Sequence, residues 1–187
     1  MYAGAVGENR WLTDEQQWAW RRLAALVTLL PATLDTQLQR DAQLSHFGYW
    51  VLAMLSETPG RALRMSELAA LSNSSQSRLS HMTTRLEERG WIRRERATQD
   101  RRGSLAVLTD AGYAKVVASA PAHVEHVRSL VFDTLSPEQA RQLGEMCELL
   151  LRVVDPDGTA AAVEQRGGGH QGAGDPSADP PTTGPAR

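Results

Sequence analysis

The sequence predicts a mainly α-helical fold that contains one small β-hairpin. The chain has 187 residues, enough for one domain, or for one domain and a tail. Aromatic residues make up 5% of the chain, whereas strands favour aromatic and β-branched side chains. Apolar residues recur at spacings of three and four in several segments, and this helical period gives way to a strand-like pattern after Gly90.

Two helices are predicted in the first third of the chain. Residues 13–16 (Thr-Asp-Glu-Gln) have the pattern of a capping box, so a long helix is expected over about 14–40, with a kink at Pro31. The apolar face of this helix consists of Leu23, Leu26, Val27, Leu30, Leu34 and Leu38. A second helix is expected over about 45–57, because Thr-Pro-Gly at 58–60 ends it.

Two shorter helices and a hairpin follow. The first is expected from Glu67 to Leu71, and Ser-Asn-Ser-Ser at 72–75 then offers N-cap hydroxyls to a helix that runs to Arg89. Gly90 suits the position after the end of that helix. Residues 91–96 and 104–108 are predicted strands, and the charged turn between them makes a β-hairpin.

The chain then becomes helical again. Thr109 and Asp110 cap a predicted helix over about 110–132, with a bend expected at Pro121, and Ser-Pro-Glu-Gln at 136–139 is a second capping box. The last helix carries an apolar stripe of Leu143, Met146, Cys147, Leu150, Leu151 and Val154. Residues 155–187 hold almost no large apolar side chains, so we expect a disordered tail.

The order of the predicted elements is that of a winged helix-turn-helix: a helix, a short helix, a tight turn, a helix and a charged hairpin. We assign 1–154 to this domain, with a DNA-binding lobe over about 44–108. The amphipathic helices at about 14–40 and 110–154 find little partner surface in so small a lobe, and pairing across a two-fold axis buries both. This predicts helical dimerisation regions at both ends of the domain. The alternative is that these helices fold back on their own domain.

The charge of the chain is unevenly distributed. The net charge is -2, yet residues 61–102 contain ten arginines against five acidic residues. This basic centre indicates an anionic partner or, equally, a solvated face rich in ion pairs. No apolar run approaches the roughly 18 residues of a membrane span, and no secretory signal is visible, so a cytoplasmic protein is expected. A single cysteine excludes an internal disulfide and a cysteine-based zinc finger.

The helix after 72–75 has side chains that suit recognition of double-stranded DNA. Leu79, Met82 and Leu86 share one face, which is expected to pack in the core. The opposite face carries short polar side chains that can enter a major groove: Ser77, Ser80, His81 and Thr84. Ser74, Ser75 and Gln76 lie at the start of the helix, where the free N–H groups favour a phosphate. Arg78 and Arg85 flank the polar face and are expected to reach backbone oxygens of the DNA. At the hairpin tip, Arg101 and Arg102 beside Asp100 suit a narrow minor groove.

At these residues the sequence resembles the multiple-antibiotic-resistance-regulator (MarR) family of bacterial transcription factors. The matching segments are 65–69 (Met-Ser-Glu-Leu-Ala), 85–94 (Arg-Leu-Glu-Glu-Arg-Gly-Trp-Ile-Arg-Arg), 100–102 (Asp-Arg-Arg) and 108–112 (Leu-Thr-Asp-Ala-Gly). The resemblance covers residues 12–154 and implies a homodimer that binds palindromic promoter DNA, usually as a repressor released by a small molecule. It also implies that Asp100 and Arg102 belong to a wing motif whose arginine enters the minor groove.

By the same resemblance, the aromatic region of the first two helices borders a ligand pocket. The candidate pocket residues are Trp18, Arg22, His46, Phe47 and Trp50, although core and dimer packing explain at least half of the aromatic residues in this region. No catalytic arrangement, metal site or cofactor motif is predicted. Cys147 is expected to be a buried packing residue rather than an oxidant sensor. His123 and His126, together with His46, are expected to face solvent rather than to bind a metal ion. The alternative function is a winged-helix protein-interaction module without a DNA site.

Overall fold

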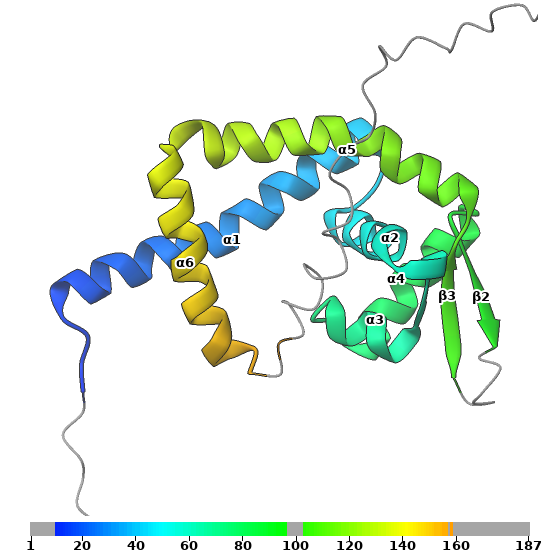
Figure 1. The fold of residues 1–187 in the computed structure, drawn as a ribbon, viewed down its shortest axis with the longest axis horizontal. Coiled ribbons are helices and arrows are strands. Elements are labelled where there is room, and N and C mark those ends of the chain that lie inside the picture. Colours follow the sequence, from blue (N-terminus) through cyan, green and yellow to red (C-terminus); the bar gives the residue numbers. More distant parts are fainter. Residues whose placement is uncertain (1–9, 97–102, 157, 159–187) are drawn as a thin grey trace, which may run out of the picture.

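The computed structural model describes residues 10–96, 103–156 and 158. In this part of the chain it has six α-helices, two short 3-10 helices and three strands (Figure 1). In chain order they are α1 (Asp14–Ala42), α2 (His46–Glu57), η1 (Pro59–Arg61), β1 (Ala62–Arg64), α3 (Met65–Leu71), α4 (Gln76–Glu88), β2 (Ile92–Arg96), β3 (Ser104–Leu108), α5 (Asp110–Leu130), η2 (Phe132–Thr134) and α6 (Pro137–Val154). The predicted mainly α-helical winged fold is confirmed.

Both predicted capping boxes are present. At the start of α1, Thr13 Oγ1 accepts a hydrogen bond from Gln16 N at 3.2 Å, and Gln16 Oε1 accepts one from Thr13 N at 3.0 Å. Ser136 and Gln139 make the same reciprocal pair at the start of α6. Helices α1 and α5 each continue as one element through their internal prolines.

The sheet has one strand more than the sequence indicated. Its order is β1-β3-β2, with both pairs antiparallel, so β3 is central and β2 is an edge strand. Strand β1 has only three residues, and it exists because Ala62–Arg64 pair with residues more than forty positions later in the chain. The predicted start of α3 at Glu67 was two residues late, because the Glu67 carboxylate accepts a hydrogen bond from Arg64 N at 3.2 Å and so caps the helix earlier.

The core lies between α2, α3, α4, the sheet and the C-terminal half of α1. Its largest fully buried side chains are Leu38, Val51, Leu52, Leu55, Leu68, Leu79, Thr83, Leu86 and Ile92. The start of α5 packs directly on this lobe, since a Cβ at Gly112 would lie 2.0 Å from the backbone oxygen of Trp91. Thr109, the N-cap of α5, also donates a hydrogen bond to the oxygen of Gly90 at 2.7 Å. The lobe and α5 are therefore tightly joined.

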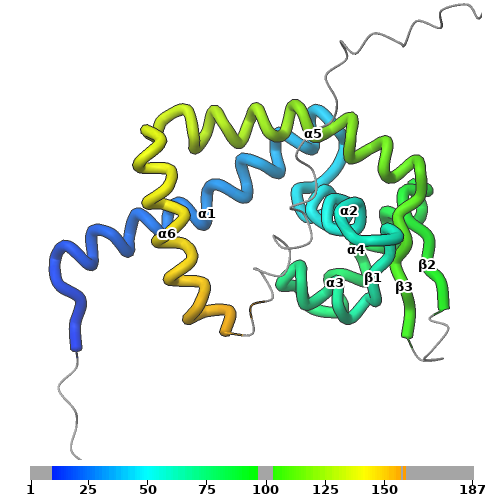
Figure 2. The backbone as a smooth tube through the Cα atoms, in the orientation of Figure 1, coloured from blue at the N-terminus to red at the C-terminus, as the bar shows by residue number. Residues whose placement is uncertain are grey.

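The first half of α1 and all of α6 project away from this lobe (Figures 1 and 2). Helix α6 has no buried residue in the single chain, and its apolar stripe faces solvent. The expectation that Cys147 is buried is therefore wrong for one chain, because within the described residues Cys147 is exposed and no residue of α6 is buried. Among the described residues, no helix combines the length and apolar character that a membrane span needs.

Candidate nucleic-acid interface

Helix α4 has one face in the core and one in solvent. Leu79, Thr83 and Leu86 are buried, and the Thr83 hydroxyl satisfies itself by donating to the backbone oxygen of Leu79 at 3.0 Å. Four of the predicted groove-facing residues are exposed: Ser77, Ser80, His81 and Thr84. Of these, Thr84 has its hydroxyl engaged, since Thr84 Oγ1 donates to the backbone oxygen of Ser80 at 3.0 Å and accepts from Arg94.

The residues at the start of α4 divide into capping residues and a free one. Ser75 is the N-cap, and its Oγ accepts from Arg78 N at 3.2 Å. The Ser74 hydroxyl lies 2.9 Å from that of Ser72 and is half-buried. Gln76, the first helical residue, is exposed, and its side chain makes no hydrogen bond within the described residues. Gln76 is thus the residue of this group most open to an external partner.

A cleft of about 440 Å³ separates α4 from the sheet. It is lined by Arg64, Met65, Ser66, Gln76, Ser80, Arg94, Gly103 and Ser104. These residues come from the end of β1, the start of α3, the first half of α4, strand β2, and the start of β3 with the residue before it. Gln76 and Ser80 of α4 therefore border the same cleft as the hairpin.

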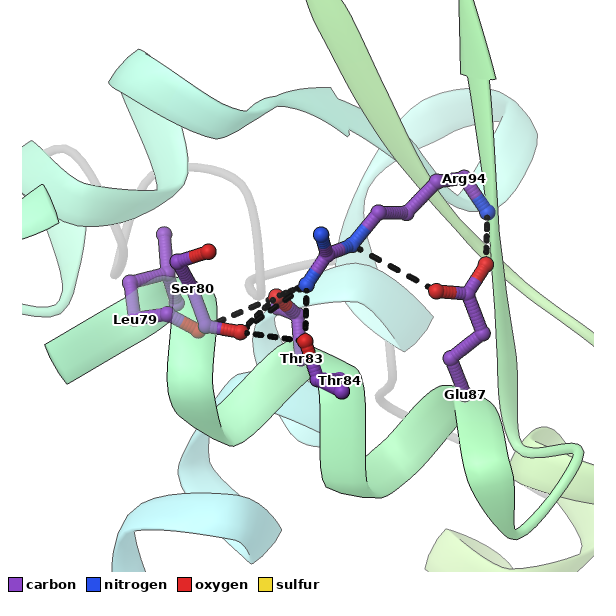
Figure 3. A network of polar contacts seen from close by, with 6 residues as sticks. All are labelled: Leu79, Ser80, Thr83, Thr84, Glu87 and Arg94. Atoms are coloured by element: carbon purple, nitrogen blue, oxygen red, sulfur yellow. Dashed lines mark hydrogen bonds and ion pairs between the residues drawn. The ribbon is translucent and has the colours of Figure 1, made fainter. Parts of the chain in front are cut away.

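Arg94 crosses this junction and joins the hairpin to α4 (Figure 3). Its Nη2 donates to Thr83 Oγ1 at 2.6 Å, to Ser80 O at 2.8 Å and to Thr84 Oγ1 at 2.8 Å. Its backbone N donates to Glu87 Oε1 at 2.9 Å, and its Nε lies 3.5 Å from Glu87 Oε2.

Arg94 is not among the site residues predicted from the sequence. A signal was nevertheless present, because strand alternation puts Arg94 on the same face as the buried Ile92. An arginine on the inward face of a strand needs acceptors on the element that it faces.

Two arginines of α4 itself have no acidic partner in the part of the chain that the structure describes. The Arg78 guanidinium lies 4.4 Å from the centroid of the Phe47 ring, and Arg85 is exposed. Within the described residues, neither makes an ion pair. By contrast, Arg61 pairs with Asp110 at 3.2 Å. The predicted residues Asp100, Arg101 and Arg102 lie outside the described residues.

A second cavity, of about 650 Å³, lies between α1, α2 and α4. It is lined by Thr28, Pro31, Ala32, Asp35, His46, Phe47, Trp50, Ser72 and Arg78. The structure thus brings together three predicted pocket residues, His46, Phe47 and Trp50. Trp18 and Arg22 do not line it, and instead Arg22 lies over the Trp18 ring at 4.0 Å in the exposed half of α1.

Partly buried histidines lie beside this cavity. The rings of His46 and His123 have centroids 5.9 Å apart, and Tyr49 lies 4.6 Å from His123. Burial lowers the pKa of both histidines, with a smaller opposing effect of Asp35 on His46. The expectation that His46, His123 and His126 face solvent is therefore wrong, because all three are partly buried between α1, α2 and α5. No group of three or more potential metal ligands occurs among the described residues.

These features define a winged helix-turn-helix protein whose recognition helix presents polar side chains and unpaired arginines. The sequence model of the MarR family matches residues 45–104. Sco3205, a MarR family transcriptional regulator from Streptomyces coelicolor solved in complex with DNA, is 48% identical, with a TM-score of 0.77; the match covers 80% of this chain and 94% of Sco3205. The chain belongs to the MarR family, a family of transcriptional regulators.

Two further solved structures are similar. AbsC, a MarR family transcriptional regulator from Streptomyces coelicolor, is 40% identical with a TM-score of 0.73, over 78% of this chain and 97% of AbsC. Bordetella bronchiseptica BpsR, whose DNA binding is regulated by 6-hydroxynicotinic acid, is 20% identical with a TM-score of 0.62, over 71% of this chain and 98% of BpsR. At that identity BpsR supports the fold alone. The comparison with curated proteins finds no match.

Proposed function

We propose that this chain is a homodimeric regulator that binds a palindromic operator and is released from it by a small molecule, most simply as a repressor. The observation that carries the proposal is the outer face of α4. Its short polar side chains lie beside Arg78 and Arg85, which have no acidic partner within the described residues.

This face suits a DNA duplex for two physical reasons. Short polar side chains such as those of Ser77 and Ser80 enter a major groove without steric conflict and hydrogen-bond base edges. Unpaired guanidinium groups gain from phosphate oxygens without first breaking an internal ion pair. Sco3205, which is 48% identical, was crystallised with DNA, and this supports the same partner class here.

The exposed apolar surface supports the homodimer. In the single chain α1 exposes Trp18, Trp20, Leu23, Leu26, Val27 and Leu29, and α6 exposes Met146, Leu149, Leu150, Leu151, Val153 and Val154. Large apolar patches are rare on the surface of soluble monomers. Pairing of α1 and α6 across a two-fold axis buries this surface and sets two α4 helices about one DNA turn, ~34 Å, apart.

The cavity of about 650 Å³ supports control by a small molecule. Its walls combine Phe47 and Trp50 with the cation of Arg78, which suits an aromatic anion. It also touches both α1 of the dimerisation region and α4 of the DNA-binding lobe. A ligand that binds one arrangement of these helices more tightly shifts the dimer away from the operator-binding state. The size of the shift equals the difference in binding free energy between the two arrangements, commonly ~1–3 kcal/mol.

A titration of the purified chain with DNA from upstream of its own gene tests the proposal. We expect saturable binding that Arg85→Ala weakens. Arg93→Ala is the matched control, because Arg93 pairs with Glu95 at 2.6 Å on the other side of the hairpin. Absence of binding at low salt contradicts the proposal and favours the alternative, a winged-helix module that binds an acidic protein.

A further inference from the structure

We propose that Arg94 is a positioning residue for DNA recognition, which holds the hairpin against α4 so that both meet a duplex as one unit. The inference rests on the proposed function and extends it to a residue that acts through others. Its basis is the set of contacts that Arg94 makes to two turns of α4 (Figure 3).

The hairpin needs such a connection because β2 is an edge strand. It pairs only with β3 within the described residues, and after Ile92 the residues Arg93, Glu95 and Arg96 are exposed. Arg94 is therefore the last residue of β2 whose side chain reaches back to the helix.

The contacts of Arg94 are placed where they fix the reading face. Its Nη2 carries two hydrogens and meets three acceptors within 2.8 Å, two of which belong to Ser80 and Thr84 of the outer face of α4. One turn further, the Glu87 carboxylate meets both the backbone N and the Nε of Arg94. Hydrogen bonds from a charged donor are stronger than neutral ones, so the position of the hairpin follows that of α4.

Arg94 is poorly available to a phosphate. Its Nε is buried, and only 30% of its side chain is exposed. Arg78 and Arg85, by contrast, have no carboxylate partner within the described residues. Arg94 therefore contributes to DNA binding by orientation, and the free cations contribute by direct contact.

Glu87→Ala separates these two roles by the sign of its effect. Removal of a negative charge from a DNA-binding lobe strengthens general attraction to DNA, whereas loss of the Arg94 partner weakens specific binding if positioning matters. We expect Glu87→Ala and Arg94→Ala each to lower affinity for the upstream duplex about tenfold. Because both substitutions break the same contact, we expect the double variant to bind the duplex as tightly as the single variant with the lower affinity. Glu88→Ala is the matched control, because Glu88 is an exposed neighbour of equal charge, and we expect no loss.

Hydrogen exchange of the free protein provides a second readout. We expect faster exchange of the amides of β2 in Glu87→Ala than in Glu88→Ala, and if Glu87→Ala does not fold, Glu87→Gln replaces it. Unchanged or tighter specific binding by Glu87→Ala overturns the positioning role. The positioning role is also overturned if Arg94→Ala lowers DNA affinity and reduces the salt dependence of DNA binding by about one ion, because that result identifies a direct phosphate contact. Failure of the wild-type chain to bind any duplex is a different result, which refutes the proposed function itself.

Discussion

The guanidinium of Arg78 lies over the ring of Phe47, 4.4 Å from its centroid. Arg78 belongs to α4, and Phe47 belongs to the first turn of the cavity-lining helix α2. One cation thus lies on the recognition helix and in the wall of the cavity between α1 and α2. The proposed function therefore predicts that an anion bound in that cavity competes with DNA phosphate for the guanidinium of Arg78.

Arg78→Ala is therefore expected to affect both DNA and ligand. Loss of one phosphate contact weakens operator binding by ~1–3 kcal/mol and lowers the salt dependence by about one ion. It also reduces the effect of an aromatic anion on DNA affinity. Arg85→Ala is the comparison, since Arg85 is outside the cavity lining: it weakens DNA binding and keeps the response to the ligand. Fluorescence anisotropy across a salt series measures both, and equal ligand responses in the two variants contradict the shared role of Arg78.

Arg102→Ala tests the wing expectation that comes from the sequence. An arginine inserted in a narrow minor groove interacts with an enhanced negative potential, so its loss weakens operator binding by ~1–3 kcal/mol. Anisotropy with the same duplex measures this loss. A variant that binds as tightly as the wild type speaks against a DNA-reading wing.

Gly112→Ala tests the junction between the lobe and α5. The added Cβ lies 2.0 Å from the Trp91 backbone oxygen, so either α5 or the hairpin must shift, and overpacking of this kind costs ~1–3 kcal/mol or more. Gly144→Ala is the control, because a Cβ there meets no atom within 4 Å. Urea denaturation compares the two, and equal free energies of unfolding contradict the close packing of α5 on the lobe.

The histidines beside the cavity predict a pH dependence of stability. Burial lowers the pKa of His46 and His123 in the folded state, so the unfolded chain binds protons first as the pH falls below about 6.5. Their contribution is fully present above that pH and is lost as the pH falls towards the lowered pKa values. We expect a smaller free energy of unfolding at pH 5.5 than at pH 7.5, and a smaller difference in His123→Gln. An unchanged pH dependence in that variant contradicts the assignment.

Local signals in the sequence were sufficient for the helices and the hairpin. Capping boxes at Thr13 and Ser136 depend on residues three apart, so they are visible without knowledge of the fold. Strand β1 was missed because its three residues become a strand only by pairing with β3, which is distant in the sequence. Short strands of this kind carry no periodicity of their own.

The candidate site shows the same limit. The exposed face of α4 follows from helical periodicity, whereas the contact of Arg94 with Thr84 joins two elements and is a property of the fold. The pocket residues divided in the same way. His46, Phe47 and Trp50 are neighbours on α2 and share a cavity, but Trp18 lies more than two turns of α1 before the nearest lining residue, Thr28.

A hydroxyl-radical footprint on the upstream duplex reports DNA contact and two-fold symmetry together. For a dimer that binds through both copies of α4, we expect two equivalent protected segments whose centres are about 10 base pairs apart, and loss of both in Arg85→Ala. Uniform cleavage at low salt, or a single asymmetric protected segment, contradicts a dimer that places two copies of α4 in successive major grooves.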